Sequence, residues 1–193
     1  MMKIIIDYSM IDCEYLDDFL CALSHVDKKY VLYQFGDDYK YPERVFAYEF
    51  YHQYRLIMEE KKGKYKDLYL NGEQTKLSKV WEGLAQITPD LVLHGKIGEK
   101  DDTGESQKWL CEIKMISNSN VKDDLEKIKR DEGILKFQNY IFLYVGATIK
   151  NLKDKLEGCD KDKIDNNTIC ICAFYDEDGI QITCRSLFEI INS

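Results

Sequence analysis

Apolar residues recur at helical spacing in four segments of the chain. In the first of these, Leu16, Phe19 and Leu23 would lie on one face of a helix. In the second, Pro42 suits the first helical turn, and no glycine interrupts the run that follows it. The spacing predicts helices over Cys13 to Val26, Pro42 to about Lys61, Val121 to Leu135 and Ile149 to Leu156.

Short apolar or alternating runs between these segments predict strands. They are KIIID, a piece around Leu68 to Leu70, TPDLVLH, KWLCEIKMI, NYIFLYVGA, TICICAFY and IQITC. The polar loop GKIGEKDDTGESQ joins TPDLVLH to KWLCEIKMI and predicts a hairpin, and the last two strands meet at Asp178-Gly179. This order of elements predicts an α/β fold, with a mixed sheet flanked by helices.

Length and composition favour one domain over residues 1–193. A chain of 193 residues with 45% hydrophobic content can bury one sizeable core, and its two prolines mark no linker. No stretch approaches the ~18 apolar residues of a membrane span, and the N-terminus meets Asp7 and Asp12 too early for a signal peptide. We therefore expect a cytoplasmic protein without a membrane partner.

The cysteines and histidines indicate what kind of metal site is plausible. The seven cysteines are an odd number without a Cys-x-x-Cys pair, which is typical of free thiols. The three histidines are widely spaced, so the ligand pattern of a structural zinc site is missing. A metal bound by this chain should therefore have oxygen ligands.

The net charge of the whole chain argues against a nucleic-acid partner, but the charge of a local surface can differ from it. The formal charge is -8, whereas affinity for a phosphate backbone comes largely from Lys and Arg. Lysines cluster in the runs 61–66 and 150–163, so a local basic surface is compatible with the sequence. A solvated face is the favoured interpretation of both runs.

The predicted hairpin carries the candidate chemistry. Successive strand residues point to opposite faces, so Glu112 and Lys114 share a face of KWLCEIKMI. Pro89-Asp90 lies at the entry of the preceding strand, and a hairpin would bring Asp90 beside Glu112. Two carboxylates placed together repel unless a cation intervenes, and Mg²⁺ prefers such hard oxygen ligands.

Glu49 is a further candidate from the helix over Pro42 to Lys61. A step of about 100° per residue puts Glu49 between Val45 and Leu56, on the stripe expected to face the core. A buried carboxylate is costly unless it is paired or bound to a metal. We expect Glu49, Asp90, Glu112 and Lys114 to converge on one concavity, although an ion pair with Lys114 would also explain a buried Glu49.

These residues resemble the PD-(D/E)XK nuclease superfamily, which has the restriction-endonuclease-like fold. The resemblance rests on Glu49 in a helix, Pro89-Asp90 on a strand and Glu112-Ile113-Lys114 on the next strand. YEFYHQYR (48–55), TPDLVLH (88–94) and DLEK (124–127) are similar to an uncharacterised bacterial branch of that superfamily. The resemblance covers about residues 42–146 of this chain.

The resemblance implies a nuclease that hydrolyses phosphodiester bonds, with DNA as the expected substrate. It implies that Asp90, Glu112 and the backbone carbonyl of Ile113 hold Mg²⁺, for which Mn²⁺ would substitute, and that Glu49 completes the shell. Lys114 would act on the nucleophile and stabilise negative charge in the transition state. Lys127 or Gln138 would assist from the following segment, and a homodimer is compatible with the pattern.

Two other classes of function stay open. A domain of the same fold that has lost catalysis would serve as a protein-binding or assembly module, which the acidic net charge permits. Alternatively, Asp90, Glu112 and Lys114 would form a plain salt-bridge network in an oligomeric structural protein. The sequence leaves the choice between DNA and RNA, and the role of residues 1–41 and 147–193, undecided.

Overall fold

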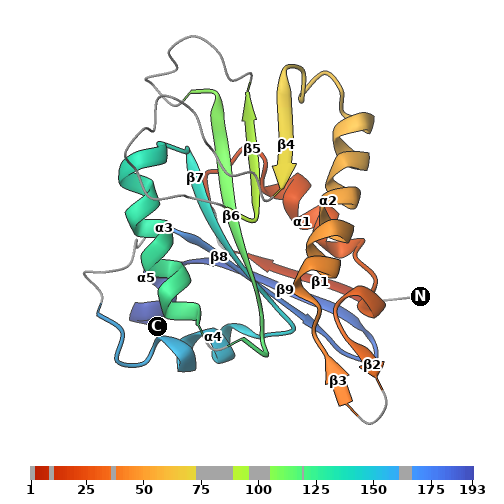
Figure 1. Cartoon of the computed structure of the whole chain (residues 1–193), viewed down its shortest axis with the longest axis vertical. Coiled ribbons are helices and arrows are strands. Elements are labelled where there is room, and N and C mark those ends of the chain that lie inside the picture. Colours follow the sequence, from red (N-terminus) through yellow and green to blue (C-terminus); the bar gives the residue numbers. More distant parts are fainter. Residues whose placement is uncertain are drawn as a thin grey trace.

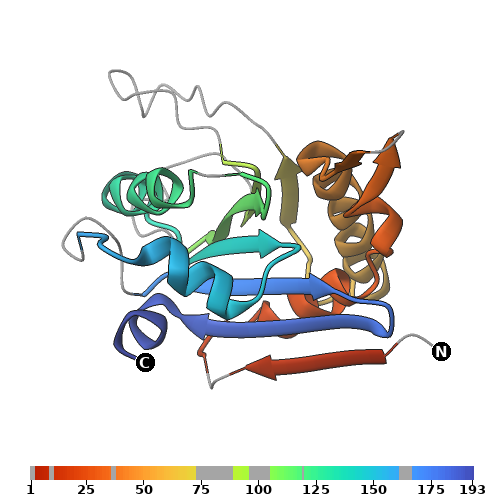
Figure 2. The same ribbon diagram turned by 90° about the horizontal axis from the view of Figure 1, so that it is seen from below.

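A seven-stranded mixed sheet lies at the centre of the protein, with helices on both faces (Figures 1 and 2). The computed structural model describes residues 3–8, 11–35, 38–72, 89–95, 105–118, 120–160 and 167–193. The strand order is β1-β9-β8-β7-β6-β5-β4. The strands are β1 (Lys3–Tyr8), β4 (Leu68–Gly72), β5 (Leu91–Gly95), β6 (Gln107–Met115), β7 (Asn139–Val145), β8 (Ile169–Tyr175) and β9 (Gly179–Ser186). The predicted α/β fold with a mixed sheet flanked by helices is confirmed.

The central strands β6, β7 and β8 run parallel to one another. Parallel neighbours need a crossover connection, and the chain supplies helices α3 (Val121–Leu135) and α4 (Ile149–Leu156). Strands covered on both faces are almost continuously apolar, which is why Phe142 and Leu143, adjacent in β7, are both fully buried. Strands β5 and β9 join this group antiparallel, so the sheet is mixed.

Two hydrophobic cores lie on opposite faces of the sheet. Helices α1 (Leu16–Ser24) and α2 (Glu43–Glu60) bury Phe19 and Phe50 against one face. Helices α3, α4 and α5 (Leu187–Asn192) bury residues such as Leu125 and Leu152 against the other (Figure 2). Neighbouring residues of one strand belong to different cores, as the alternation along a strand requires.

A buried acid ties the end of α2 to α1. Asp18 is 1% exposed, and its carboxylate accepts hydrogen bonds from Lys61, Lys64 and Tyr65. The Tyr65 hydroxyl is in turn 3.0 Å from that of Tyr54. We call Asp18, Lys61, Lys64 and Tyr65 the α1–α2 network. Because every oxygen of Asp18 has a donor, burial of this charge is compensated.

The structure also contains elements that the apolar pattern does not predict. These are a 3-10 helix η1 (Lys28–Tyr30), the small hairpin of β2 (Tyr33–Phe35) and β3 (Asp38–Lys40), and α5. Helix α5 begins with a capping box in which Ser186 and Glu189 satisfy each other's backbone N–H groups. That Ser-x-x-Glu spacing is the sequence signal for α5. Strand β7 ends before Gly146, whose φ of +76° favours glycine.

Some expected positions lie outside the described residues. They are Thr88, residues 96–104 of the hairpin loop, and Lys161 and Lys163 of the second lysine run. Within the described ranges, no helix is both long and apolar enough to cross a membrane.

Candidate active site

The predicted hairpin of β5 and β6 is confirmed, and it brings Asp90 beside Glu112. The antiparallel register pairs Leu91 with Cys111, so Asp90 reaches the following residues of β6. One carboxylate oxygen of Asp90, Oδ2, accepts a hydrogen bond from the backbone N–H of Ile113 at 2.7 Å. This contact fixes the Asp90 side chain at the end of the sheet.

Glu112 and Lys114 point from β6 towards α3. The Lys127 ammonium donates to Glu112 Oε1 at 2.7 Å, and Lys114 Nζ lies 3.0 Å from Asp124 Oδ2. Asp124 and Lys127 are three residues apart, so both lie on one face of α3. Glu112 and Lys114 of β6 thus each face a residue of opposite charge on α3.

Glu43, in the first turn of α2, also belongs to this group. Its Oε2 is 3.9 Å from Lys114 Nζ, and its charge acts on Asp90. The sequence signal for Glu43 is an acid directly after Pro42 at a helix start, a pattern that helix-dipole stabilisation explains without any site. The motif drew attention to Glu49 instead, and Glu43 was missed.

Glu49 lies elsewhere, and the prediction that it faces the core is wrong. Val45 and Leu56, expected beside it on the core stripe, are 44% and 47% exposed. The core side of α2 consists of Phe46, Phe50, Tyr54, Ile57 and Met58. The half-buried Glu49 carboxylate accepts a hydrogen bond from Gln53 Nε2 at 2.7 Å. The apolar positions fit two neighbouring stripes on this helix, and packing selects the one centred on the aromatic residues.

Burial shifts the acidity of both strand carboxyls. Burial raises the pKa of Asp90 to about 6, and the charge of Glu43 acts in the same direction. The hydrogen bond from the Ile113 N–H and the charges of Lys127 and Lys114 act to lower this pKa. Burial and the charge of Asp90 raise the pKa of Glu112 to about 8, although Lys127 counteracts them. Two carboxyls that each resist ionisation beside the other are typical of functional sites.

Lys114 stays protonated in this setting. Burial alone would lower its pKa, but the carboxylates of Asp124, Glu43 and Asp90 outweigh burial and raise it. The site therefore holds a fixed positive charge next to two carboxyls whose ionisation is suppressed.

The donor chemistry of the group fits a hard divalent cation. Four carboxyls (Glu43, Asp90, Glu112 and Asp124) surround two ammonium groups (Lys114 and Lys127), which leaves an excess of acid. In the part of the chain that the structure describes, no three Asp, Glu, His or Cys side chains are arranged as a metal-ligand group. A cation here would use two carboxylates with backbone oxygen and water, as Mg²⁺ does in proteins.

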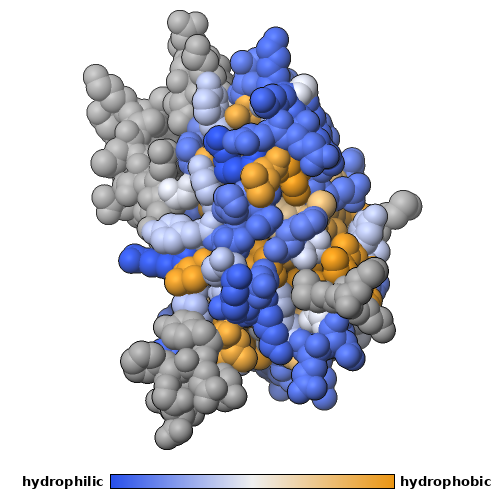
Figure 3. Space-filling view, turned by 90° about the vertical axis from the view of Figure 1, so that its right-hand side faces the viewer, coloured by the Kyte–Doolittle hydropathy of each residue, from blue (hydrophilic) through white to orange (hydrophobic). Residues whose placement is uncertain are grey.

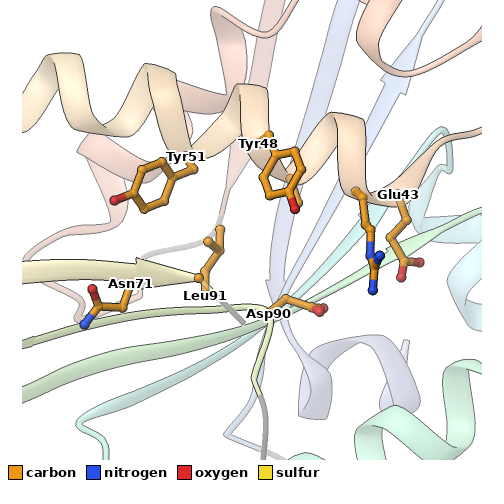
Figure 4. Close-up of a pocket in the computed structure, with 9 residues that line it drawn as sticks. Glu43, Tyr48, Tyr51, Asn71, Asp90 and Leu91 are labelled. Atoms are coloured by element: carbon orange, nitrogen blue, oxygen red, sulfur yellow. The ribbon is translucent and has the colours of Figure 1, made fainter. Parts of the chain in front are cut away.

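A cavity of about 530 Å³ adjoins Asp90 on the α2 side of the sheet (Figure 4). We call it the α2 pocket; its lining residues are Glu43, Arg44, Ala47, Tyr48, Tyr51, Asn71, Gly72, Asp90 and Leu91. At about 100° per residue, Glu49 projects about 160° away from both Ala47 and Tyr51, and it is not among them. Asp90 lines this pocket, whereas Glu112 and Lys114 face α3 behind it.

The sequence-predicted residues therefore divide into two groups. Asp90, Glu112, Ile113 and Lys114 meet at one end of β5 and β6, joined by Glu43, Asp124 and Lys127. Glu49 lies outside this group.

Comparison with models of known protein families, with curated proteins and with solved structures finds no match to this chain.

Proposed function

We propose that this protein is a metal-dependent nuclease that hydrolyses phosphodiester bonds, with DNA as its substrate and Mg²⁺ or Mn²⁺ as its cofactor. The proposal includes the restriction-endonuclease-like arrangement that the PD-(D/E)XK resemblance implies. One observation carries it: the half-buried Asp90 and the buried Glu112 lie side by side with raised pKa values, next to a charged lysine.

Asp90 and Glu112, with the backbone carbonyl of Ile113, would hold the cation. The Ile113 N–H already binds Oδ2 of Asp90, which orients the carboxylate in advance. When bound, Mg²⁺ supplies Lewis acidity towards the phosphate and its attacking water. The ion would also remove the repulsion between the two carboxylates, so binding should convert both to their charged forms.

Lys114 has the electrophilic role in this proposal. Its ammonium would stabilise the negative charge that builds on the phosphoryl oxygens as water attacks in line. Asp124 at 3.0 Å and Glu43 at 3.9 Å hold Lys114 from two helices and keep it protonated. Lys127 contacts the Glu112 carboxylate, and a bound cation would replace it as the partner of that carboxylate.

A structural ion-pair network is the second candidate, and one observation favours it. Lys127 and Lys114 each contact a carboxylate within 3.0 Å, so the lysines partly neutralise the acids without a metal. Under this alternative the protein would act as a binding or assembly module. It would neither bind Mn²⁺ at this site nor cleave nucleic acid.

Cleavage assays on a supercoiled plasmid and on labelled oligonucleotides separate the two candidates. We expect cleavage with Mg²⁺ or Mn²⁺, none with EDTA, and loss of cleavage in Glu112→Gln. Glu49→Gln is the matched control, because it changes the same functional group outside the site, and it should keep wild-type activity. Mn²⁺ titration by calorimetry should show binding to wild type and Glu49→Gln only. Activity that survives in Glu112→Gln, or no Mn²⁺ binding to wild type, would rule out the proposal.

A further inference from the structure

The α2 pocket has two chemically different ends. Figure 4 shows Tyr48 and Tyr51 reaching from α2 towards Leu91 and Asn71 on the strands, with Glu43 and Asp90 at the opposite end. One end is therefore aromatic in character, and the other is acidic. A ligand that fills the cavity would meet both.

The aromatic end suits a planar, uncharged ring. Tyr48 is 64% exposed, and the Tyr51 hydroxyl donates to the Leu70 carbonyl at 3.2 Å, which holds its side chain at the pocket wall. A cavity of about 530 Å³ has room for one nucleotide, and ligand pockets commonly measure about 300–1,000 Å³. Aromatic side chains of this kind stack on nucleobases without regard to sequence.

Asn71 lines this end of the pocket, but its amide points to the other face of the sheet, because its neighbour Leu70 packs in the core under α2. Its Nδ2 is 2.6 Å from His94 Nε2, and His94 Nδ1 is 2.6 Å from the Gly95 carbonyl oxygen. A ring N–H must face that carbonyl, so Nε2 accepts and the Asn71 amide donates to it. Figure 4 shows the Asn71 side chain on the far side of β4 from α2, so this amide is not presented to a base in the pocket.

Charge decides which part of a nucleotide enters. Among the described lining residues, Glu43 and Asp90 face one cation, Arg44, so a phosphate deep in the cavity would meet net negative charge. An uncharged base avoids this repulsion. The phosphate next to it would stay outside the cavity near Asp90, which belongs to both the pocket lining and the candidate active site.

We propose that the α2 pocket binds one unstacked nucleobase of a single-stranded nucleic acid, and so places the adjoining phosphodiester at the candidate active site. This inference rests on the proposed function and names its substrate class. Bases of an intact duplex are stacked and paired, and they cannot enter a pocket between a helix and a sheet without being flipped out. Single strands are therefore the preferred substrate.

Binding without catalysis tests the inference. Fluorescence anisotropy would be measured in EDTA at low ionic strength with labelled dT10, U10, a dT10–dA10 duplex and a ten-unit abasic strand. We expect dT10 to bind about ten-fold tighter than the abasic strand and the duplex. U10 shows whether the sugar matters, since the pocket proposal concerns the base alone and predicts binding of both strands.

Variants locate the binding. Tyr48→Ala should weaken dT10 binding about ten-fold and remove the preference over the abasic strand. Tyr8→Ala is the matched control, because Tyr8 is a similarly exposed tyrosine on β1, at the other edge of the sheet. The same series in an Asp90→Asn background, which removes one repelling charge, should show the same dependence on Tyr48.

The outcomes separate this inference from the proposed function. Equal affinity for abasic and normal strands, a preference for duplex, an unchanged Tyr48→Ala variant, or no binding in either background would overturn the pocket assignment. Cleavage of plasmid with any of these results would leave the nuclease proposal standing. Conversely, binding of dT10 that depends on Tyr48, without cleavage under any metal, would support the pocket and remove the nuclease proposal.

Discussion

This protein holds two groups of carboxylates paired with lysines, and the carboxyl pKa values of the two groups shift in opposite directions. In the α1–α2 network, burial would raise the pKa of Asp18, but hydrogen bonds from Lys61, Lys64 and Tyr65 outweigh it and lower the pKa. At the candidate active site, burial prevails, and the pKa values of Asp90 and Glu112 are raised.

The difference lies in the ratio of donors to acids. Three donors serve one carboxylate in the α1–α2 network, whereas four carboxyls gather around two lysines at the candidate site. A compensated buried charge stabilises the fold, and an uncompensated pair destabilises it until something binds. Under the proposed function, a bound cation would supply the compensation that the second group lacks.

The largest expected contrast is in catalysis. Lys114→Ala should lower turnover about 10²–10³-fold, because the transition state loses a nearby positive charge. Metal affinity should stay the same or rise slightly, since a cation no longer meets the ammonium. Initial cleavage rates at saturating Mn²⁺, with calorimetry for metal affinity, would measure both. Lys61→Ala from the α1–α2 network is the control and should stay within two-fold of wild type; equal loss in both variants would contradict the assignment.

The next contrast is in stability. Asp18→Asn should lower the free energy of unfolding by about 3–4 kcal/mol, because the amide cannot satisfy Lys61, Lys64 and Tyr65 together. Urea unfolding at pH 7, followed by circular dichroism, gives this value. A loss under about 1 kcal/mol would show that the α1–α2 network contributes little.

The pH dependence of stability should reflect the candidate site. Asp90 and Glu112 have raised folded-state pKa values, so the unfolded chain ionises first as pH rises, and the folded state loses stability. The metal-free protein should lose about 4–5 kcal/mol between pH 5 and pH 8. Asp18 does not contribute in this window, because its lowered pKa stabilises the fold throughout.

Urea unfolding in EDTA across this range, with Glu112→Gln for comparison, tests the pH prediction. The variant should show a flatter profile than wild type. A wild-type protein that becomes more stable from pH 5 to pH 8 would mean that the two carboxylates are stabilised as charges, as Asp18 is.

The smallest expected effect has the most informative sign. Asp90→Asn should raise the metal-free free energy of unfolding by about 1–2 kcal/mol, or about 2–6 °C in melting temperature, because it removes one repelling charge and keeps an acceptor for the Ile113 N–H. It should also cancel the stabilisation that Mn²⁺ gives wild type. Thermal scans with EDTA and with Mn²⁺ measure both effects. Under the ion-pair alternative, Asp90→Asn would melt lower and Mn²⁺ would shift neither protein.

The sequence predicts most of the sheet and the hairpin because local patterns determine them. Alternation places Glu112 and Lys114 on one face, and the hairpin brings Asp90 to them, as observed. Contacts between distant elements are less visible: Glu43 meets Lys114 across 71 positions of sequence, and nothing in the pattern around Glu43 indicates it. The face of α2 also depends on which apolar stripe packs best, which only the assembled core decides.

Helix α2 also bears on how this protein could change over time. Phe46, Phe50 and Tyr54 are buried in the core, whereas Tyr48 is exposed on the side of the helix that lines the α2 pocket, with Arg44. Replacement of the buried residues would leave cavities, but replacement of exposed ones is usually tolerated within about 0.5 kcal/mol. A library randomised at positions 44 and 48 should therefore consist mostly of folded variants, so the chemistry of the α2 pocket can be changed without loss of the scaffold.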